Sequence, residues 1–591
     1  MLAPYGYQLL DSASAIASYN ALDTLWLIVA AALVFFMQAG FAMVESGFTR
    51  AKNAGNIIMK NTLDMAFATI AFIAIGCSFA YGTDLAGLGI IGVPDLFLSH
   101  TDLSNGYTSG AYILFQLVFA GAAATIVSGG MAERTKFGSY CIYSIIMCAF
   151  VYPVVCHWVW SGNGWLYNMG YIDFAGSTVV HMIGGITALL GAFFLGPRIG
   201  KYDKDGKAHA FPGHNLTIAA LGVFILWFGW FGFNGGSSLG ISSFELGTLT
   251  GEVLLITCLA AAAGTVSSML YSRFKFGYPD VSFTLNGCLA GMVAICAGAS
   301  AVDYYGAIII GAIAGITVVV VAEFIDKRVK IDDPVGAFAV HGACGAVGTI
   351  LVGFLANPDC YAGVAGVLYG GSLSTLGIQC FGVGIIALWT IITMGTVFYV
   401  IKHTIGLRVS AEEELSGLDI SEHGLASAYS GIMPDLHIIH DESELGMSVQ
   451  SMAAGVQAMS GMTVTDFSAP SAEGLKKVVV ITRRTMVGAL KASLDKVGVT
   501  GMTVTYVAGY GAQKGHASLY RGIEVDSTLL PKVKAEVVLP AKKVNEVVAA
   551  IKSAVYTGAV GDGKIFIYSV DNAVRVRTGE AGDAAVSNES A

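Results

Sequence analysis

The stretches DFAGSTVVH (173–181) and DPVGAFAVH (333–341) each place a histidine eight residues after an aspartate, inside a long apolar segment. A titratable ring inside a membrane span is costly, so it usually marks a path for a substrate. Each aspartate can accept backbone N–H groups at the start of a helix, where its charge also suits the helix dipole. The alternative is two unrelated buried histidines that bond to backbone carbonyls. The shared spacing favours one path that contains both His181 and His341.

The composition predicts a membrane domain. The chain has 591 residues, of which 55% are hydrophobic and only 12% charged, and its mean hydropathy is +0.67. A membrane-spanning helix needs about 20 mostly apolar residues. The chain contains eleven such segments, at 23–45, 62–82, 110–131, 139–159, 177–196, 214–238, 251–272, 282–299, 304–325, 337–356 and 376–402. We therefore predict an α-helical membrane protein with 11 transmembrane helices.

The basic residues give these spans a direction. Every lysine and arginine up to Arg408 follows an odd-numbered span, and the N-terminus and the loops after even-numbered spans carry none. Because basic loops stay on the cytoplasmic side, we expect the N-terminus outside and a multi-pass protein of the cell inner (plasma) membrane. Glu45 and Asp64 lie near the cytoplasmic ends of the first two spans, where we expect them to pair with nearby basic residues.

The two histidine motifs lie in the fifth and tenth spans, which predicts a 5+5 inverted repeat. Five is odd, so the second five spans enter the membrane from the opposite face. Eight helical residues rise about 12 Å, so both rings should meet near the middle of a core about 30 Å thick. The spans offer apolar side chains and imidazoles rather than the oxygen ligands that a hydrated metal ion prefers. This lining favours a small neutral species, or one made neutral on entry.

Several long stretches resemble the ammonium transporter (Amt/Mep/Rh) family, in the same order: MVESGFTRAKN, GGMAERTKFG, HWVWSGNGW, DFAGSTVVHMIGG, WFGFNGGS, LNGCLAGMVAI, IDDPVGAFAVHGACG and GLRVSAEEELSGLDISEHG. The resemblance implies a homotrimer with one pore per subunit. It also implies an external ammonium site on Trp160, Phe119 and Ser237, where aromatic faces attract a cation. Two departures, Ser177 and Gly336, do not change this interpretation.

The resemblance further assigns the pore lining. Phe119 and Phe233 would stack as an outer gate, with Phe115 beside them, and His181 and His341 would form a twin-histidine relay. Asp173 matches the family's essential aspartate near the outer site, where it would add negative potential as well as cap a helix. Ammonium would lose a proton at or below the outer site, because its charge does not enter an apolar lumen cheaply. Ammonia would then pass the imidazoles, while the proton returns outside or crosses separately.

Three other functions stay open on the sequence. An ammonium sensor would bind ammonium and signal through the tail with little net flux. A gas channel similar to the Rh members would conduct carbon dioxide, although the aromatic cation site favours ammonium. An enzyme would use a nucleotide site in the tail, but we see no poised nucleophile or general base there and expect none.

The tail predicts a separate α/β domain. Residues 431–474 contain no lysine or arginine, are rich in Ser, Gly, Ala and Met, and are typical of a linker. From Lys476 onward, apolar runs and one helical periodicity predict the order βαββαβ, which is ferredoxin-like. We expect domains at 1–408 (membrane), 409–430 (cytoplasmic regulatory segment), 431–474 (linker) and 475–591.

The tail stretches GYGAQKGHASLYRG, LLPKVKAEVV, TGAVGDGKIFIYSV and VRVRTGE closely resemble PII signal-transduction proteins. The GDGK segment offers backbone donors and a lysine that suit phosphates, and we expect Arg575 and Arg577 to alternate along one strand face. The resemblance implies that ATP or ADP and 2-oxoglutarate with Mg²⁺ act as effectors. It assigns nucleotide binding to Thr503, Gly561, Asp562, Gly563, Lys564, Arg575 and Arg577, and the remaining effector contacts to Gly511, Gln513 and Lys532.

Three features set this tail apart from separate PII proteins. Val525 stands where bacterial relatives carry a uridylylated tyrosine, so we expect no uridylylation. RRTMVG (483–488) replaces the usual KPFKLD, which changes the effector environment. The domain is also fused to the channel, and tethering raises its effective concentration to about the millimolar range when the linker reaches. We expect the loop 511–529, with Arg521 as a plug, to make an intramolecular contact that blocks or frees the pore.

Overall fold

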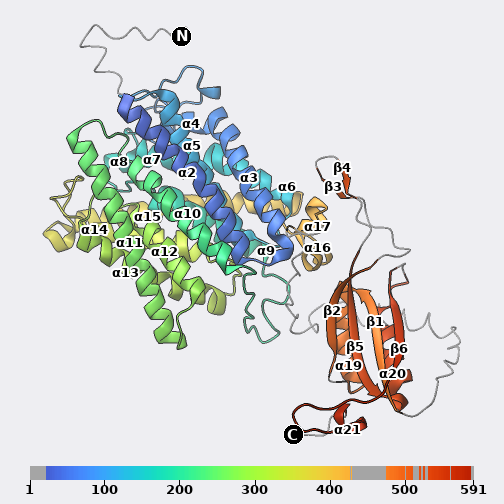
Figure 1. Cartoon of the computed structure of the whole chain (residues 1–591). Coiled ribbons are helices and arrows are strands. Elements are labelled where there is room, and N and C mark those ends of the chain that lie inside the picture. The colour runs from blue at the N-terminus through green and yellow to red at the C-terminus, as the bar shows by residue number, and fades with distance from the viewer. Residues whose placement is uncertain are drawn as a thin grey trace, which may run out of the picture. The chain divides into compact units, whose positions relative to one another are not determined.

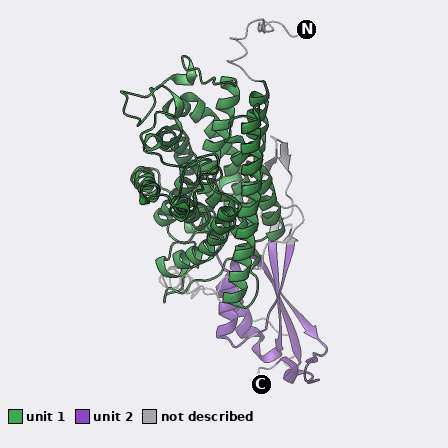
Figure 2. Ribbon diagram, turned by 90° about the vertical axis from the view of Figure 1, so that its left-hand side faces the viewer, with its two compact units in different colours: residues 1–430 green, residues 431–591 purple. Residues whose placement is uncertain are grey.

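The computed structural model describes residues 21–425, 428, 474–499, 501–509, 518–520, 523–525, 530–558 and 561–586 (Figure 1). The chain divides into two compact units, residues 1–430 and 431–591 (Figure 2), and each is considered separately. The predicted linker lies almost wholly outside the described residues, so the domain boundaries stay predictions.

Unit 1 is a bundle of apolar helices. The helical segments are α2 (Ala21–Phe48), α3 (Ala54–Ala71), η2 (Phe72–Gly76), α4 (Cys77–Tyr81), α5 (Ser109–Met131), α6 (Phe137–Ile146), η4 (Met147–Val151), α7 (Tyr152–Trp160), η5 (Ser177–Met182), α9 (Ile183–Leu195), α10 (Leu216–Gly236), α11 (Phe244–Phe276), α12 (Val281–Ile295), α13 (Tyr304–Phe324), η6 (Ile325–Val329), η7 (Phe338–Ala343), α14 (Cys344–Leu355) and α15 (Leu373–Thr404). Ten helical stretches of the described chain are long and apolar enough to cross a membrane. The predicted eighth span corresponds to α12, which has only 15 residues.

Both histidines lie in π-helical turns. His181 belongs to η5, which continues into α9, and His341 belongs to η7, which continues into α14. Such turns widen a helix by one residue and are frequent at functional sites. The two halves of the bundle therefore share a local distortion at the same place in each motif.

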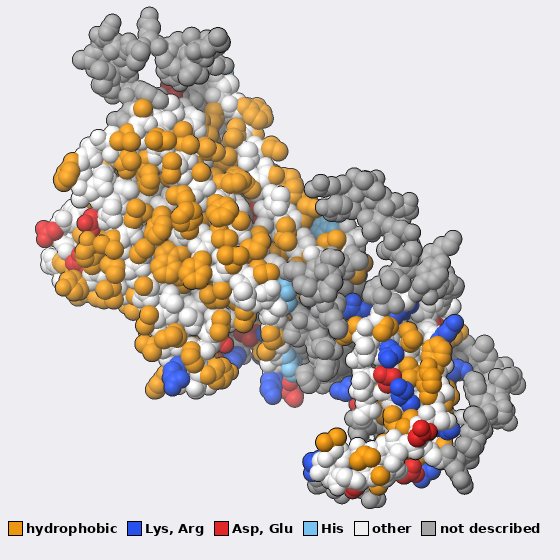
Figure 3. Space-filling view, viewed as in Figure 1, with side chains coloured by type: hydrophobic (Ala, Val, Ile, Leu, Met, Phe, Trp, Pro, Cys, Tyr) orange, Lys and Arg blue, Asp and Glu red, His pale blue; other side chains and the backbone are white. Residues whose placement is uncertain are grey.

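Glycines let the helix backbones touch in the part of the bundle built from α11, α12 and α13. A Cβ added at Gly291 would lie 2.2 Å from the Ala260 carbonyl oxygen, and one at Gly311 would lie 2.3 Å from the same atom. Any side chain at either position would separate the helices, as is common for small residues at membrane helix interfaces. The apolar side chains left outside cover the middle of the visible face of unit 1 (Figure 3).

The end of unit 1 where its lysines and arginines gather, called the basic end here, is held by buried ion pairs. Arg198 donates to Glu133 at 2.8 Å and to Asp332 at 2.8 Å, and Arg50 also pairs with Glu133. Burial acts to raise the pKa of Glu133, but the guanidinium groups of Arg50 and Arg198 outweigh it and lower the pKa to about 2. Arg134 adds a bond to the Asp332 carbonyl at 2.7 Å.

The structure corrects one part of the predicted loop pattern. The second helix begins at Ala54 rather than at residue 62, after a short turn over Ala51–Asn53. Lys60 therefore lies inside α3, where its side chain is fully buried, and not in a loop. Its apolar stem packs within the bundle while its ammonium group lies over the Tyr140 ring, 5.1 Å from the centroid.

The segment after α15 folds back onto the basic end through two short helices, α16 (Ala411–Ser416) and α17 (Leu418–His423). Lys52 donates to the Glu414 and Leu415 carbonyls at 2.7 and 2.8 Å. The Asp419 carboxylate accepts the backbone N–H groups of Gly55 and Asn56 at the start of α3. These bonds attach the segment to the first two spans.

Unit 2 contains a four-stranded antiparallel sheet in the order β2-β5-β1-β6 (Figure 1). Its elements in chain order are β1 (Leu475–Arg483), α19 (Val487–Lys496), β2 (Thr503–Gly509), β5 (Leu530–Pro540), α20 (Val544–Val555) and β6 (Lys564–Val570), with a small hairpin of β3 (Ser518–Tyr520) and β4 (Ile523–Val525) between β2 and β5. Alternate residues such as Val478, Val480 and Val537 pack against Leu490 and Ile551 of the helices. The predicted ferredoxin-like order βαββαβ is confirmed.

One expectation for the tail is wrong. Arg575 and Arg577 do not lie along a strand, because the chain turns back at this point. The Gly579 N–H donates to the Arg575 carbonyl at 2.8 Å, and Gly579 has a φ of 75°. A left-handed residue of this kind reverses the chain and prevents a continuous strand.

Candidate functional site

Two imidazole rings meet inside unit 1, as their spacing predicts. The Nδ1 atoms of His181 and His341 are 3.2 Å apart, and the rings stack with centroids 5.2 Å apart. Both side chains are buried. Since a hydrogen bond needs one donor and one acceptor, neutral rings must hold opposite tautomers here. His181 Nε2 is buried with no hydrogen-bond partner within the described residues.

The two aspartates fix the backbone that carries these histidines. Asp173 accepts the N–H groups of four residues, Gly176 to Val179, and the Thr178 hydroxyl at 2.6 Å. Asp333 accepts three N–H groups, from Gly336 to Phe338. The predicted capping of both helix starts is confirmed.

An aromatic cluster lies on one side of His181. Phe119 and Phe233 stack with centroids 4.0 Å apart, and Phe115 lies 4.8 Å from Phe119. Trp160 meets Phe119 edge-on at 6.1 Å. All four rings are thus brought together, and only Trp160 is not fully buried. The arrangement offers an aromatic surface that suits a cation, next to a closed stack of two rings.

Two polar groups border this cluster. The Trp160 indole donates to the Asp173 carbonyl at 2.7 Å, so the ring is held next to the capped helix start. Ser237 follows α10, and its hydroxyl donates to the Phe233 carbonyl at 2.9 Å. That hydroxyl keeps its lone pairs for another donor, because its one proton is already used.

Trp230 is a member of the site that the sequence reasoning missed. Its ring stacks on His181 with centroids 5.2 Å apart, and Phe233 stacks on the same imidazole at 5.2 Å. Trp230 precedes Phe233 by three residues on α10, so both share a helix face. The three-residue spacing from Phe233 is the sequence signal that could have identified Trp230.

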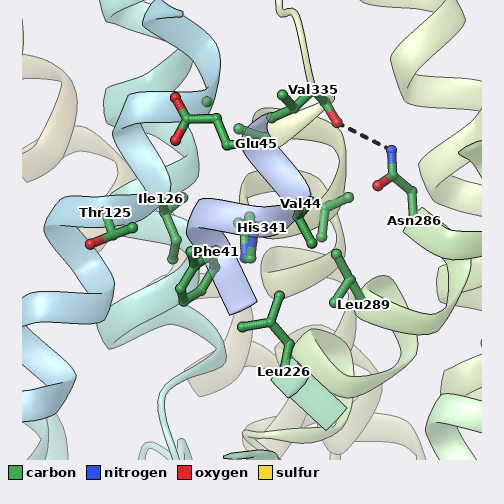
Figure 4. Close-up of a pocket in the computed structure, with 13 residues that line it drawn as sticks. Phe41, Val44, Glu45, Thr125, Ile126, Leu226, Asn286, Leu289, Val335 and His341 are labelled. Atoms are coloured by element: carbon green, nitrogen blue, oxygen red, sulfur yellow. Dashed lines mark hydrogen bonds between the residues drawn. The ribbon is translucent and has the colours of Figure 1, made fainter. Parts of the chain in front are cut away.

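On the other side of the ring pair, His341 borders a small cavity of about 30 Å³ (Figure 4). A volume of this size holds a water or a molecule as small as ammonia. Its walls are mostly apolar, with polar groups from three helices: Glu45, Thr125 and Asn286. Asn286 is turned aside by a bond to the Val335 carbonyl at 3.2 Å.

The structure does not support the predicted ion pairs of Glu45 and Asp64. Glu45 accepts from Ser128 at 2.6 Å and from Asn61 at 2.9 Å. Asp64 accepts from Ser144 at 2.8 Å and from the Tyr140 hydroxyl. Within residues 21–425, neither carboxylate forms an ion pair. Neutral donors on neighbouring helices bond to their oxygens instead.

The tail brings a second set of predicted residues together. Asp562 accepts the N–H groups of Thr557 and Gly558 at 2.7 and 3.0 Å, and the Lys532 ammonium donates to the Gly561 carbonyl at 3.1 Å. Gly563 has a φ of 120°, and a Cβ there would lie 2.0 Å from the Ile481 carbonyl oxygen. Only glycine fits at this close approach between the GDGK turn and β1.

The charges around this turn suit an anion. Lys564 and Arg577 are exposed, whereas Arg575 pairs with Glu580 at 2.6 Å. Burial acts to raise the pKa of Asp562, but hydrogen bonds from Thr557 and Gly558 outweigh it and lower the pKa. Thr503 is exposed on β2. Gly511, Gln513 and Arg521 lie outside the described residues.

The fold and the ring pair define an integral membrane protein with a histidine-lined interior and a ferredoxin-like tail. Residues 25–429 match the model of the Ammonium Transporter Family, and residues 475–580 match that of Nitrogen regulatory protein P-II. The chain belongs to the ammonium transporter family and carries a PII domain in the same polypeptide.

Individual relatives agree with this assignment. Ammonium transporter Amt2 of Archaeoglobus fulgidus is 44% identical over 423 residues, which cover 69% of this chain and 88% of that protein. Among solved structures, a Sensor Amt Protein has a TM-score of 0.64 at 38% identity and covers 68% of this chain and 98% of its own. Mep2 of Saccharomyces cerevisiae has a TM-score of 0.60 at 25% identity, with 67% and 89% covered.

Proposed function

We propose that this protein recruits ammonium at its outer aromatic cluster, removes a proton, and conducts ammonia past the paired histidines. The observation that carries the proposal is the 3.2 Å contact between the Nδ1 atoms of His181 and His341 inside an apolar interior. A ring pair of this kind offers hydrogen bonds without a fixed charge. The relatives named ammonium transporters support the same substrate.

Recruitment uses the aromatic rings and one hydroxyl. Ammonium lies against Trp160 and Phe119, and cation–π attraction is worth about 2 kcal/mol when water is excluded. Ser237 accepts one of its N–H groups. Asp173 adds negative potential near this site, because its carboxylate is buried on the same residue whose backbone carbonyl accepts from the Trp160 indole.

Conduction requires that the charge be left behind. When a cation enters a dry apolar passage, the hydration free energy that it loses is far larger than the free energy of its contacts with the passage. The proton therefore leaves ammonium at or below the aromatic cluster, and ammonia moves through the Phe119–Phe233 stack when these rings separate. His181 and His341 then exchange hydrogen bonds with ammonia.

The proposed assembly is a homotrimer with one passage per subunit. Each subunit crosses the cell inner membrane eleven times, with α12 as the shortest crossing, in a 5+5 inverted repeat. The matching capped motifs and π-helical turns at both histidines support this symmetry. The basic end and the tail lie in the cytoplasm, and the N-terminus lies outside.

Regulation is assigned to the PII domain. The turn around Gly561–Lys564, with Arg577 and Thr503, suits the phosphates of ATP or ADP, and Lys532 suits the 2-oxoglutarate that binds with Mg²⁺. Effector exchange moves the loop 511–529 and brings Arg521 to or from the pore of a subunit. This proposal predicts that Arg521→Ala removes the effector dependence of uptake.

An ammonium sensor is the second candidate. It is favoured by the likeness to a Sensor Amt Protein at 38% identity. In this alternative, ammonium occupancy changes the state of the PII domain while little ammonium crosses.

Flux through purified protein separates the two candidates. Proteoliposomes on a solid-supported membrane should give an ammonium-evoked current, and His181→Asp should change it strongly because a fixed charge replaces a neutral ring. ATP, ADP and 2-oxoglutarate are added in turn. Ammonium binding without current or internal pH change would favour the sensor.

A further inference from the structure

The cavity below His341 contains one ionisable group that the proposed function does not use. Glu45 borders the same cavity as His341 (Figure 4), although it lies on α2 and the histidine lies on η7. The side chain is only 4% exposed. A buried carboxyl group in a membrane span is costly and usually functional.

The surroundings of Glu45 hold it in place and leave room for exchange. Ser128 and Asn61 donate to its two oxygens, one each, so the carboxylate is fixed across α5 and α3. A carboxylate has further lone pairs, and the cavity lies open to it. Ser128 and Asn61 come from the helices that flank α2, so the carboxyl group cannot turn away easily.

Four buried polar atoms of α3 and of the turn before it have no hydrogen-bond partner in the described chain: Asn53 Nδ2, Asn56 Oδ1, Lys60 Nζ and Asn61 Oδ1. Buried polar groups are normally satisfied by protein or by water. The charged and titratable side chains around Lys60, besides Glu45, are Asp64, Arg134, Tyr140, Glu422 and His423. One of the four residues with an unpartnered atom, Asn61, also bonds to Glu45, so its unsatisfied oxygen indicates a water near the carboxyl group.

We propose that Glu45 is a proton-transfer residue at the basic end of the passage. It receives the proton that crosses separately from ammonia and returns it to ammonia as the molecule leaves His341. This inference rests on the proposed function and adds the place where ammonium is formed again.

The transfer balances without any other reactant. A proton released by ammonium near Trp160 moves along the imidazole pair and a water in the cavity to a Glu45 oxygen, where an O–H bond forms. The lone pair of ammonia then takes that proton as the O–H bond breaks, giving ammonium and the carboxylate. One ammonium has crossed in total, and Glu45 is ready for the next proton.

The test compares charge movement with ammonia entry in the same proteoliposomes. After an ammonium pulse, the current on a solid-supported membrane measures the charge carried by the proton. Pyranine trapped inside the proteoliposomes measures the rise in internal pH. For Glu45→Gln we expect the current to fall at least tenfold and internal alkalinisation to rise above that of the wild type. Glutamine keeps the shape but carries no transferable acid proton, so ammonia that arrives without its own proton takes one from the internal buffer. Glu45→Asp should restore part of the current.

Ser128→Ala is the matched control, because it breaks the bond that holds Glu45 and leaves the carboxyl group. It should keep most of the current. A Glu45→Gln current within twofold of the wild type would overturn the inference. So would an equal loss of current in Glu45→Gln and Ser128→Ala with no added alkalinisation in either variant, since Glu45 would then serve only packing. If the wild type gives neither signal, the proposed function fails instead.

Thermal unfolding and a single elution peak in detergent check that each variant is folded. Glu323→Gln provides a second control, because it removes an acid proton from the same unit at a residue that does not border the cavity. Its current should resemble that of the wild type, and a loss equal to that of Glu45→Gln would also count against the inference.

Discussion

The two ends of the membrane unit are built from opposite chemistry. Around Trp160, aromatic rings stack against one another, and the one aspartate there bonds only to neutral groups. At the basic end, Glu133, Arg198 and Asp332 form a buried ion network. The first end is suited to attracting a cation and removing its water. The second resists opening, because each buried charge depends on its partner.

Breaking the ion network is the largest expected perturbation. Glu133→Gln leaves Arg50 and Arg198 without their shared counter-charge, so stability should fall by about 3–5 kcal/mol. Thermal unfolding in detergent measures it. Glu323→Gln is the control, since its pairs with Lys275 and Lys327 are partly exposed and worth about 0–1 kcal/mol. Equal losses in the two variants would contradict a difference between buried and exposed pairs.

Acid should weaken the basic end through the same residue. The pKa of Glu133 is lowered to about 2 from the ordinary 4.5. A lowered carboxyl pKa contributes stability that is present above 4.5 and is lost as the pH falls through 2, here about 3 kcal/mol. Unfolding temperature should therefore drop more steeply between pH 4.5 and 2 in the wild type than in Glu133→Gln. Parallel curves would show that Glu133 does not couple protonation to folding.

Asp173→Asn tests the outer end. Asparagine keeps one acceptor oxygen but loses the other, which accepts from Thr178 and Val179, so we expect about 2–3 kcal/mol of destabilisation and a loss of transport. Asp333→Asn is the control, because Asp333 accepts fewer bonds. If the Asp333 variant lost as much transport as the Asp173 variant, negative potential near the aromatic cluster would not be the cause.

Trp160→Leu should have the smallest effect on folding and a defined effect on recruitment. The loss of about 2 kcal/mol of cation–π attraction corresponds to about a 30-fold rise in the half-saturating ammonium concentration. Current measured over a range of ammonium concentrations gives this value. Phe115→Leu changes a ring that contacts Phe119 and should raise the half-saturating ammonium concentration less.

The contact between His181 and His341 could be predicted because helix rise converts sequence spacing into depth in the membrane. The partners of Glu45 could not. Ser128 is 83 residues away and Asn61 is 16 residues away, and their donors reach Glu45 only through the rotation of three helices. α2 and α5 are apolar on nearly all sides, so no periodicity reports that rotation.

The tail shows the same limit in another form. The chain order βαββαβ was predicted from runs of apolar residues, and the elements of unit 2 follow one another in this order. The alternation expected for Arg575 and Arg577 failed because Gly579 turns the chain, and a conformation that only one residue imposes is not visible in an alternating pattern. The nucleotide and effector roles of the tail residues stay predictions.

The single hydrogen between the two Nδ1 atoms makes the tautomers of the ring pair depend on the last proton that crossed it. When a proton enters one imidazole and another leaves its neighbour, the pair is left with its tautomers reversed, and a second proton cannot follow the same route. The rings must first return to their starting pattern. Under the proposed mechanism, the ring pair therefore passes one proton at a time, whatever the rate at which ammonia crosses.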